Sequence, residues 1–210
     1  QSVERIGNNA FKGCATLKSI TLSNAVKTIG SEAFSGCSSL RDIYLPEGLT
    51  TIGDRAFYEC RGFDILTIPS TITSFGEYVF YHAEANQLVV NCSVPDADAE
   101  LNVSSMVFTS TYFENVTFTS SVRRIGSYSF GWNTYISNID FGYGIEQIGD
   151  GAFCYNTSLG SVTLPATITS IGELSFYGCN GIKTITCHAT SVPTLGDNAF
   201  PASVAIYVPD

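Results

Sequence analysis

The residues from Leu40 to Cys60 read LRDIYLPEGLTTIGDRAFYEC, and this stretch decides the fold because its features recur along the chain. Its Ile52-Gly53 pair lies 23 residues after Ile29-Gly30, and a phenylalanine follows four residues after each repeated glycine. Phe57 has counterparts at Phe11, Phe34, Phe80, Phe108, Phe130, Phe153, Phe176 and Phe200. The sequence therefore predicts about nine turns of one unit, with one longer step of 28 residues between Phe80 and Phe108.

Alternating apolar and polar residues precede most of the Ile-Gly pairs, as in Ile43 and Leu45, and such alternation indicates a strand with one buried face. One unit cannot bury its own apolar face, whereas stacked units place equivalent residues over one another. We therefore predict a repeat solenoid with a parallel β-sheet on one face and strands about 4.8 Å apart. It forms a single domain over residues 1–210 with an irregular insertion near residues 92–106, and the register of Leu88, Val90 and Cys92 stays open.

Residues that favour helix N-termini follow the repeated glycines, and they predict short helical or 3₁₀ turns opposite the sheet. These residues are Asn8, Ser31, Asp54, Glu77, Ser127, Asp150, Glu173 and Asp197. We expect the glycine itself to supply a backbone conformation that a Cβ atom would hinder.

The composite unit, L-x-x-I-x-L-P followed by I-G-x-x-A-F-x-G-C, resembles the bacterial BspA-type leucine-rich repeats over nearly the whole chain. The segment SVPTLGDNAFPASVAIYVP, from Ser191 to Pro209, is similar to the closing repeat of such proteins. The resemblance implies a curved leucine-rich-repeat solenoid on a secreted or cell-surface protein, with adhesion to host matrix proteins or other cells. The chain departs from the pattern between Ala83 and Asn115, and repeat residues specify fold rather than function.

Composition excludes several classes of function. The net charge is −9, from 19 acidic and 10 basic residues, and the Arg123-Arg124 pair is too small for a nucleic-acid interface. No stretch of 18 apolar residues is present, so we expect no membrane-spanning segment. Residues Gln1 to Gly7 lack the apolar core of a signal peptide, so we expect any signal or anchor segment to lie outside this chain.

The seven cysteines do not have the spacing of a metal site. Cys14, Cys37, Cys60 and Cys179 share one repeat position with Ala83, Asn133 and Asn156. Residues so interchangeable favour a ladder of small buried side chains, although the spacing of neighbouring turns also permits a disulfide.

No catalytic or metal-binding constellation emerges from the other polar residues, and we expect no cofactor. His82 and His188 are interpreted as surface residues, because the side chain next to inward-facing Cys187 should point outward. Asp96, Asp98 and Glu100 could bind calcium but lack an EF-hand pattern, which favours a solvated loop. Four N-x-S/T sequences occur, at Asn91, Asn102, Asn115 and Asn156, and they carry no meaning if the source is bacterial.

Two surfaces remain as candidate binding sites. The outward strand positions are mostly small and polar, with Tyr44 and Ile65 as large exceptions, and this face is interpreted either as a site or as a solvated sheet. A second group of aromatic residues lies near the repeated phenylalanines and could either bind a partner or pack along the ridges between turns. The candidate binding residues are Tyr44, Tyr58, Tyr81, Trp132, Tyr135, Tyr155 and Tyr177.

These observations favour a non-catalytic, adhesin-like interaction module, outside the cell or on its surface, that binds matrix or cell-surface proteins or glycans. The alternative is a passive spacer that holds another domain away from the cell, because the outward strand face has mostly small polar side chains. A glycan-acting enzyme has no support beyond the exposed aromatic residues.

Overall fold

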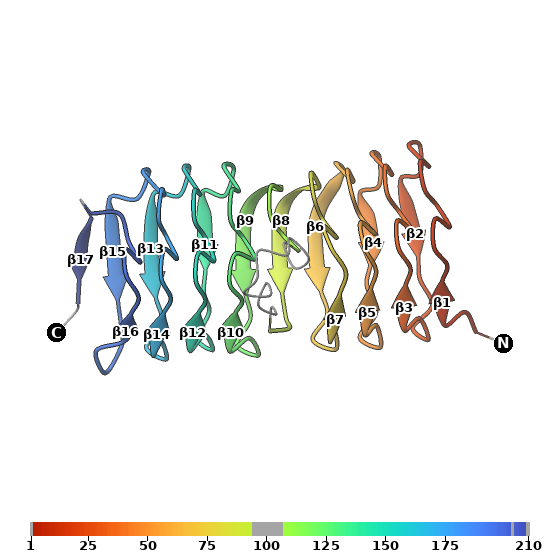
Figure 1. Ribbon diagram of the computed structural model, residues 1–210. Coiled ribbons are helices and arrows are strands. Elements are labelled where there is room, and N and C mark those ends of the chain that lie inside the picture. Colours follow the sequence, from red (N-terminus) through yellow and green to blue (C-terminus); the bar gives the residue numbers. More distant parts are fainter. Residues whose placement is uncertain (1, 94–106, 203, 209–210) are drawn as a thin grey trace.

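A stack of similar turns runs from one chain terminus to the other in the computed structural model, which describes residues 2–93, 107–202 and 204–208 (Figure 1). The longer strands lie side by side along the stack. They are β2 (Ser19–Thr21), β4 (Asp42–Tyr44), β6 (Phe63–Ile68), β8 (Glu84–Val90), β9 (Tyr112–Phe118), β11 (Asn138–Asp140), β13 (Ser161–Leu164), β15 (Thr184–Cys187) and β17 (Ala205–Tyr207). Every strand pair in this row is parallel, which confirms the predicted solenoid with its parallel sheet.

A second row consists of two-residue strands, and it contains the apolar residue of the repeated Ile-Gly pair. Its members are β1 (Arg5–Ile6), β3 (Thr28–Ile29), β5 (Thr51–Ile52), β7 (Ser74–Phe75), β10 (Arg124–Ile125), β12 (Gln147–Ile148), β14 (Ser170–Ile171) and β16 (Thr194–Leu195). They pair in parallel in two groups, β1 to β7 and β10 to β16. The sequence pattern did not predict this row, because two residues are too few to show alternation.

The register of the irregular middle turns follows from strand pairing. Leu66 of β6 is the partner of Leu88 in β8, which in turn is the partner of Val116 in β9. Leu88, Val90 and Cys92 are all buried, so the open question of their register is settled. Residues 94–106, which make up most of the predicted insertion and include Asp96, Asp98, Glu100 and Asn102, lie outside the described residues.

A continuous ladder of phenylalanine rings forms the centre of the core. Consecutive rings lie 4.8 to 5.4 Å apart between centroids, and their planes differ by at most 20°. The seven inner rings, from Phe34 to Phe176, are completely buried, whereas Phe11 and Phe200 at the ends are partly exposed. Nine rings are separated by eight steps, so the stack comprises about eight complete turns. Phe108 occupies its predicted place between Phe80 and Phe130.

The described residues contain no helix, so none of them forms a helix that could cross a membrane, and the predicted helical turns are replaced by left-handed turns. Three of the residues expected to cap helices, Asn8, Asp54 and Asp150, instead accept hydrogen bonds from the next turn of the stack. Asp54 Oδ1 accepts one from the backbone N–H of Glu77 at 2.9 Å, and Asp150 Oδ1 accepts one from that of Glu173 at 2.8 Å. Their role is structural, as predicted, but it links neighbouring turns.

The repeated glycine is required by close packing between turns rather than by a left-handed backbone. A Cβ atom on Gly53 would lie 2.6 Å from the backbone nitrogen of Ser31 in the preceding turn. Real Cβ atoms do not approach backbone atoms so closely, so a side chain here would push two turns apart. The sequence suggested that this glycine supplies a special backbone conformation, whereas the structure shows that it is needed because the preceding turn leaves no space for a Cβ atom.

Candidate functional site: an aromatic edge

Seven of the described turns contain two residues with left-handed backbone, one before and one after the ladder phenylalanine, and these residues position the surface aromatic side chains. The second left-handed position is filled by Gly13, Gly36, Glu59, His82, Ser110, Trp132, Tyr155 and Gly178. A bulky residue is disfavoured here, and its backbone conformation costs about 1–3 kcal/mol. Trp132, with φ of 57°, and Tyr155, with φ of 58°, therefore occupy positions where other turns use glycine.

The first group of rings, which we call the N-terminal aromatic cluster, consists of Tyr58, Tyr78, Tyr81, His82, Tyr112 and Tyr135. Tyr81 stacks on His82 with 4.2 Å between ring centroids and on Tyr58 with 5.8 Å. Tyr112 and Tyr135 extend the cluster with an edge-to-face contact of 5.0 Å. Tyr58, Tyr78 and Tyr81 also line a shallow groove with Lys12, Glu32, Ser35 and Arg55.

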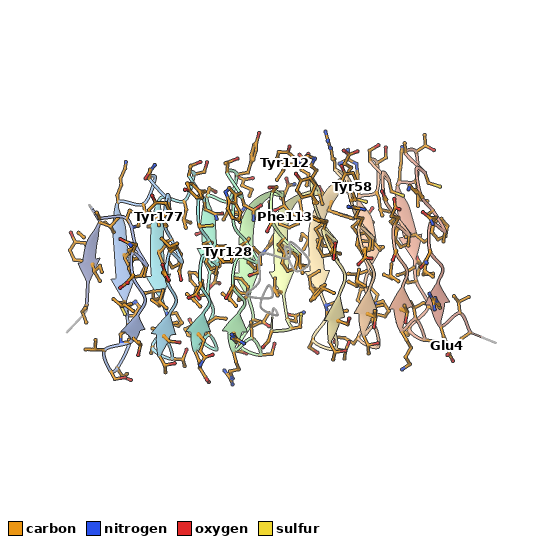
Figure 2. The ribbon with its side chains drawn as sticks, viewed as in Figure 1. Glu4, Tyr58, Tyr112, Phe113, Tyr128 and Tyr177 are labelled. Atoms are coloured by element: carbon orange, nitrogen blue, oxygen red, sulfur yellow. The ribbon has the colours of Figure 1, made fainter. Side chains whose placement is uncertain are left out.

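The second group, which we call the Trp132 cluster, consists of Tyr128, Trp132, Tyr155 and Tyr177. Trp132 lies between Tyr128 and Tyr155, with centroid distances of 6.1 and 6.0 Å and plane angles of 18° for both pairs. Tyr155 contacts Tyr177 edge to face at 5.6 Å. Figure 2 labels Tyr128 and Tyr177 on this part of the stack and Tyr58 several turns away.

Glycines in the following turns make room for two of these rings. A Cβ atom on Gly151 would collide with the ring of Tyr128, and one on Gly178 would lie 2.6 Å from Cδ1 of Tyr155. The rings therefore lean along the stack over the next turn, where they are partly covered on one side. Trp132, Tyr155 and Tyr177 remain 41%, 42% and 45% exposed. The rings therefore pack between turns, which is one of the two interpretations of the sequence, and they also keep exposed surface.

The predicted site residues fall on two separate surfaces. Tyr58, Tyr81 and Tyr135 belong to the N-terminal aromatic cluster. Trp132, Tyr155 and Tyr177 belong to the Trp132 cluster. Tyr44 is alone in lying on the exposed sheet face, where it lines a shallow depression with Asp42 and Ile65. His82, Tyr78 and Tyr112 were not predicted as site residues. A signal for His82 was present, because it follows Phe80 by two residues as Trp132 follows Phe130.

The charge around the two clusters differs. Partial burial, and then the neighbouring Glu59 carboxylate, raise the pKa of the Tyr58 hydroxyl, while Arg55 lowers it. Burial also raises the pKa of Tyr128, with further contributions from the Cys154 thiol and the carboxylates of Asp150 and Glu173. At Tyr128 two carboxylates raise the pKa, whereas at Tyr58 a carboxylate and an arginine act in opposite directions.

The cysteine and asparagine ladder is structural. Sγ of Cys60 donates to the carbonyl oxygen of Phe34 at 3.1 Å, and Nδ2 of Asn156 donates to that of Phe130 at 2.9 Å. All seven cysteines are free thiols and only Cys14 is exposed, so the ladder contains no disulfide. Because the Asn156 amide is fully buried and engaged, it cannot accept a glycan.

Neither histidine is placed for cysteine-dependent catalysis. His188 is exposed and its neighbour Cys187 is buried, as predicted, while His82 is half-buried among tyrosine rings. Within the described ranges, no group of three His, Cys, Asp or Glu residues could hold a metal ion.

Comparison with known proteins agrees with the repeat architecture. A leucine rich repeat protein of T. pallidum is 24% identical, with 92% of this chain and 67% of that one covered and a TM-score of 0.45. A leucine rich cell surface protein of Faecalibacterium prausnitzii is 21% identical, with 88% and 70% covered and a TM-score of 0.42. The chain thus spans about two thirds of the length of these proteins, and no curated protein matches it. The profile of the BspA type leucine rich repeat region, in six copies, matches residues 1–100 and 101–207. The chain therefore belongs to the BspA-type leucine rich repeat family.

Proposed function

We propose that this chain is a non-catalytic, adhesin-like module and that its binding surface is the aromatic edge formed by the two clusters. Leucine-rich-repeat proteins of this type generally act by binding proteins rather than by catalysis. The partners would be host matrix or cell-surface proteins or glycans, and the protein would act outside the cell or on its surface. The location rests on family membership alone.

The observation that carries this proposal is the order of exposed aromatic rings along the stack. Tyrosine and tryptophan dominate the energetics of protein interfaces because they bury large areas with few rotatable bonds. Trp132 is held between two other rings, so little side-chain entropy remains to be lost when a partner binds. Disfavoured left-handed backbone at Trp132 and Tyr155 supports a role for these side chains beyond folding.

The test is binding of the purified protein to a panel of matrix proteins, mucins and glycans. We expect saturable binding that falls at least roughly tenfold in a Tyr58→Ser/Trp132→Ser variant, the loss typical of a hot spot. Tyr143→Ser is the matched control, because Tyr143 is 87% exposed and belongs to neither cluster. Equal affinity in both variants would place the binding surface elsewhere.

A passive spacer is the second candidate, and the outward sheet face favours it. Ser161, Thr163 and Thr184 present only small polar groups there, which offer little to a partner. If the chain is a spacer, no member of the panel binds, and an unrelated rigid rod of similar length replaces it in the parent protein without loss of function.

A further inference from the structure

The Trp132 cluster lies in a segment of the chain that has no basic residue. From Ile125 to Ile182 the sequence contains no Lys, Arg or His. The same segment contains the carboxylates of Asp140, Glu146, Asp150 and Glu173. The net charge per residue of this segment is therefore more negative than that of the whole chain, because all 10 basic residues lie outside the segment.

Two of these carboxylates lie beside the cluster. The backbone N–H of Tyr128 donates to the carbonyl oxygen of Asp150 at 2.8 Å, and the charges of Asp150 and Glu173 both raise the pKa of the Tyr128 hydroxyl. Asp150, Glu173 and Asp197 also line an adjoining groove, in which Arg124 is the single base. Carboxylates therefore outnumber basic groups around this groove, and such an excess favours cations over anions.

The N-terminal aromatic cluster shows how this edge accommodates a cation. The guanidinium carbon of Arg55 lies 5.7 Å from the ring centre of Tyr78, its counterpart one turn later. Such a distance is typical of a cation–π interaction. At the same repeat position, the turns before and after Tyr128 have Met106 and Gly151 in the sequence, and neither residue carries a guanidinium group. One cluster thus contains its own arginine, whereas the other presents similar rings without one.

We propose that the Trp132 cluster binds an arginine side chain from a basic segment of the partner protein. The proposal rests on the proposed binding function and adds the chemical class of the partner. A tryptophan ring is the aromatic group that attracts cations most strongly, and the planar guanidinium stacks on it better than an ammonium group does. Asp150 and Glu173 supply the charge complementarity that selects a basic segment over an acidic one.

The experiment measures binding of an arginine–glycine repeat peptide by the fluorescence of Trp132, the only tryptophan in the chain. The lysine–glycine and glutamate–glycine peptides serve as comparisons. We expect saturable binding of the arginine peptide, weaker binding of the lysine peptide and none of the glutamate peptide. Affinity should decrease with added salt, because exposed charges are screened.

Variants separate the aromatic from the ionic contribution. Tyr155→Leu keeps the fluorescent reporter and should weaken arginine-peptide binding roughly two- to five-fold. Asp150→Asn keeps the oxygen that accepts the Glu173 N–H and should weaken both binding and its salt dependence. Tyr143→Leu, at an exposed tyrosine of the same segment outside the cluster, should leave the affinity unchanged.

Three outcomes would overturn the inference: equal binding of the arginine and glutamate peptides, unchanged fluorescence on binding, or unchanged affinity in Tyr155→Leu. If proteins of the panel still bind through Tyr58 and Tyr81, the proposed binding function is supported and only the proposed arginine site is wrong. If the arginine peptide binds at Trp132 but no panel protein does, the inference stands and the proposed partners are wrong.

Discussion

The side-chain amide of Asn156 donates to the carbonyl oxygen of Phe130, 26 residues earlier, at 2.9 Å. Cys179 makes the same connection one turn later, from its thiol to the carbonyl oxygen of Phe153 at 3.0 Å. A thiol and an amide are interchangeable at this position because both are small donors that satisfy a buried carbonyl group. Most members of the ladder are therefore hydrogen-bond donors as well as small side chains, and Ala83 is the exception without a donor.

We predict that the donor at Asn156 matters more than the shape of its side chain. Asn156→Leu removes one of the two side-chain donors to the carbonyl of Phe130, which keeps its bond from Nδ2 of Asn133 at 3.0 Å. The variant should therefore lower the free energy of unfolding by about 0.5–1.5 kcal/mol, the net value of one hydrogen bond. Asn156→Cys restores a donor and also removes the Oδ1 atom, which is buried without a partner, so its loss should be smaller. Urea unfolding compares the two variants, and an equal loss would show that packing alone determines this position.

The phenylalanine ladder should tolerate truncation poorly at its centre and better at its end. Phe57→Ala and Phe153→Ala should each cost about 3–5 kcal/mol, because both rings are fully buried and stacked on both sides. Phe11→Ala should cost clearly less, since Phe11 is partly exposed and stacks on Phe34 alone. Thermal unfolding monitored by circular dichroism ranks the three variants, and a near-zero effect of Phe57→Ala would contradict a stacked core.

The repeated glycine offers a matched pair of substitutions at one repeat position. Gly53→Ala places a Cβ atom 2.6 Å from the Ser31 nitrogen and should destabilise the protein by about 1–3 kcal/mol. Gly7→Ala should have little effect, because the space around Gly7 in the first turn is open to 4 Å. Equal unfolding midpoints for the two variants would mean that neighbouring turns do not pack as closely as the structure shows.

The sequence alone predicted the features that recur at fixed spacing. It did not predict which residues of neighbouring turns contact each other. Phe57 was placed in the core because its spacing recurs, and Asp54 was recognised as a capping residue. Its partner lies in the next turn and not in its own, because a sequence shows that Asp54 can accept a hydrogen bond but not which N–H lies nearby. The aromatic residues were found by type, and strand alternation already separated Tyr44 on the outward sheet face from Trp132. The division of the turn residues into two clusters was not predicted. It depends on left-handed positions, which have no clear sequence signature when the residue is not glycine.

Thiol reactivity should distinguish one cysteine from the other six. Cys14 is exposed, whereas Cys37, Cys60, Cys92, Cys154, Cys179 and Cys187 are buried. Burial raises the pKa of the Cys154 thiol to about 11 and that of Cys179 to about 12, so neither forms a reactive thiolate at neutral pH. The native protein should therefore react rapidly with one equivalent of a disulfide reagent and with the rest only on unfolding. Cys14→Ser should abolish the rapid phase.

The same thiols should make the fold sensitive to alkali. An unfolded cysteine loses its proton near its ordinary pKa of 9.0, whereas folded Cys154 keeps its proton to about 11. The folded state therefore binds more protons above pH 9, and its stability falls as the pH rises from about 9 towards 11. Tyrosines and lysines also titrate in this range, so the informative quantity is the difference between the parent and Cys154→Ala. The variant should unfold with a shallower pH dependence, measured by urea midpoints across this range. An identical slope would show that Cys154 is solvated in the folded protein.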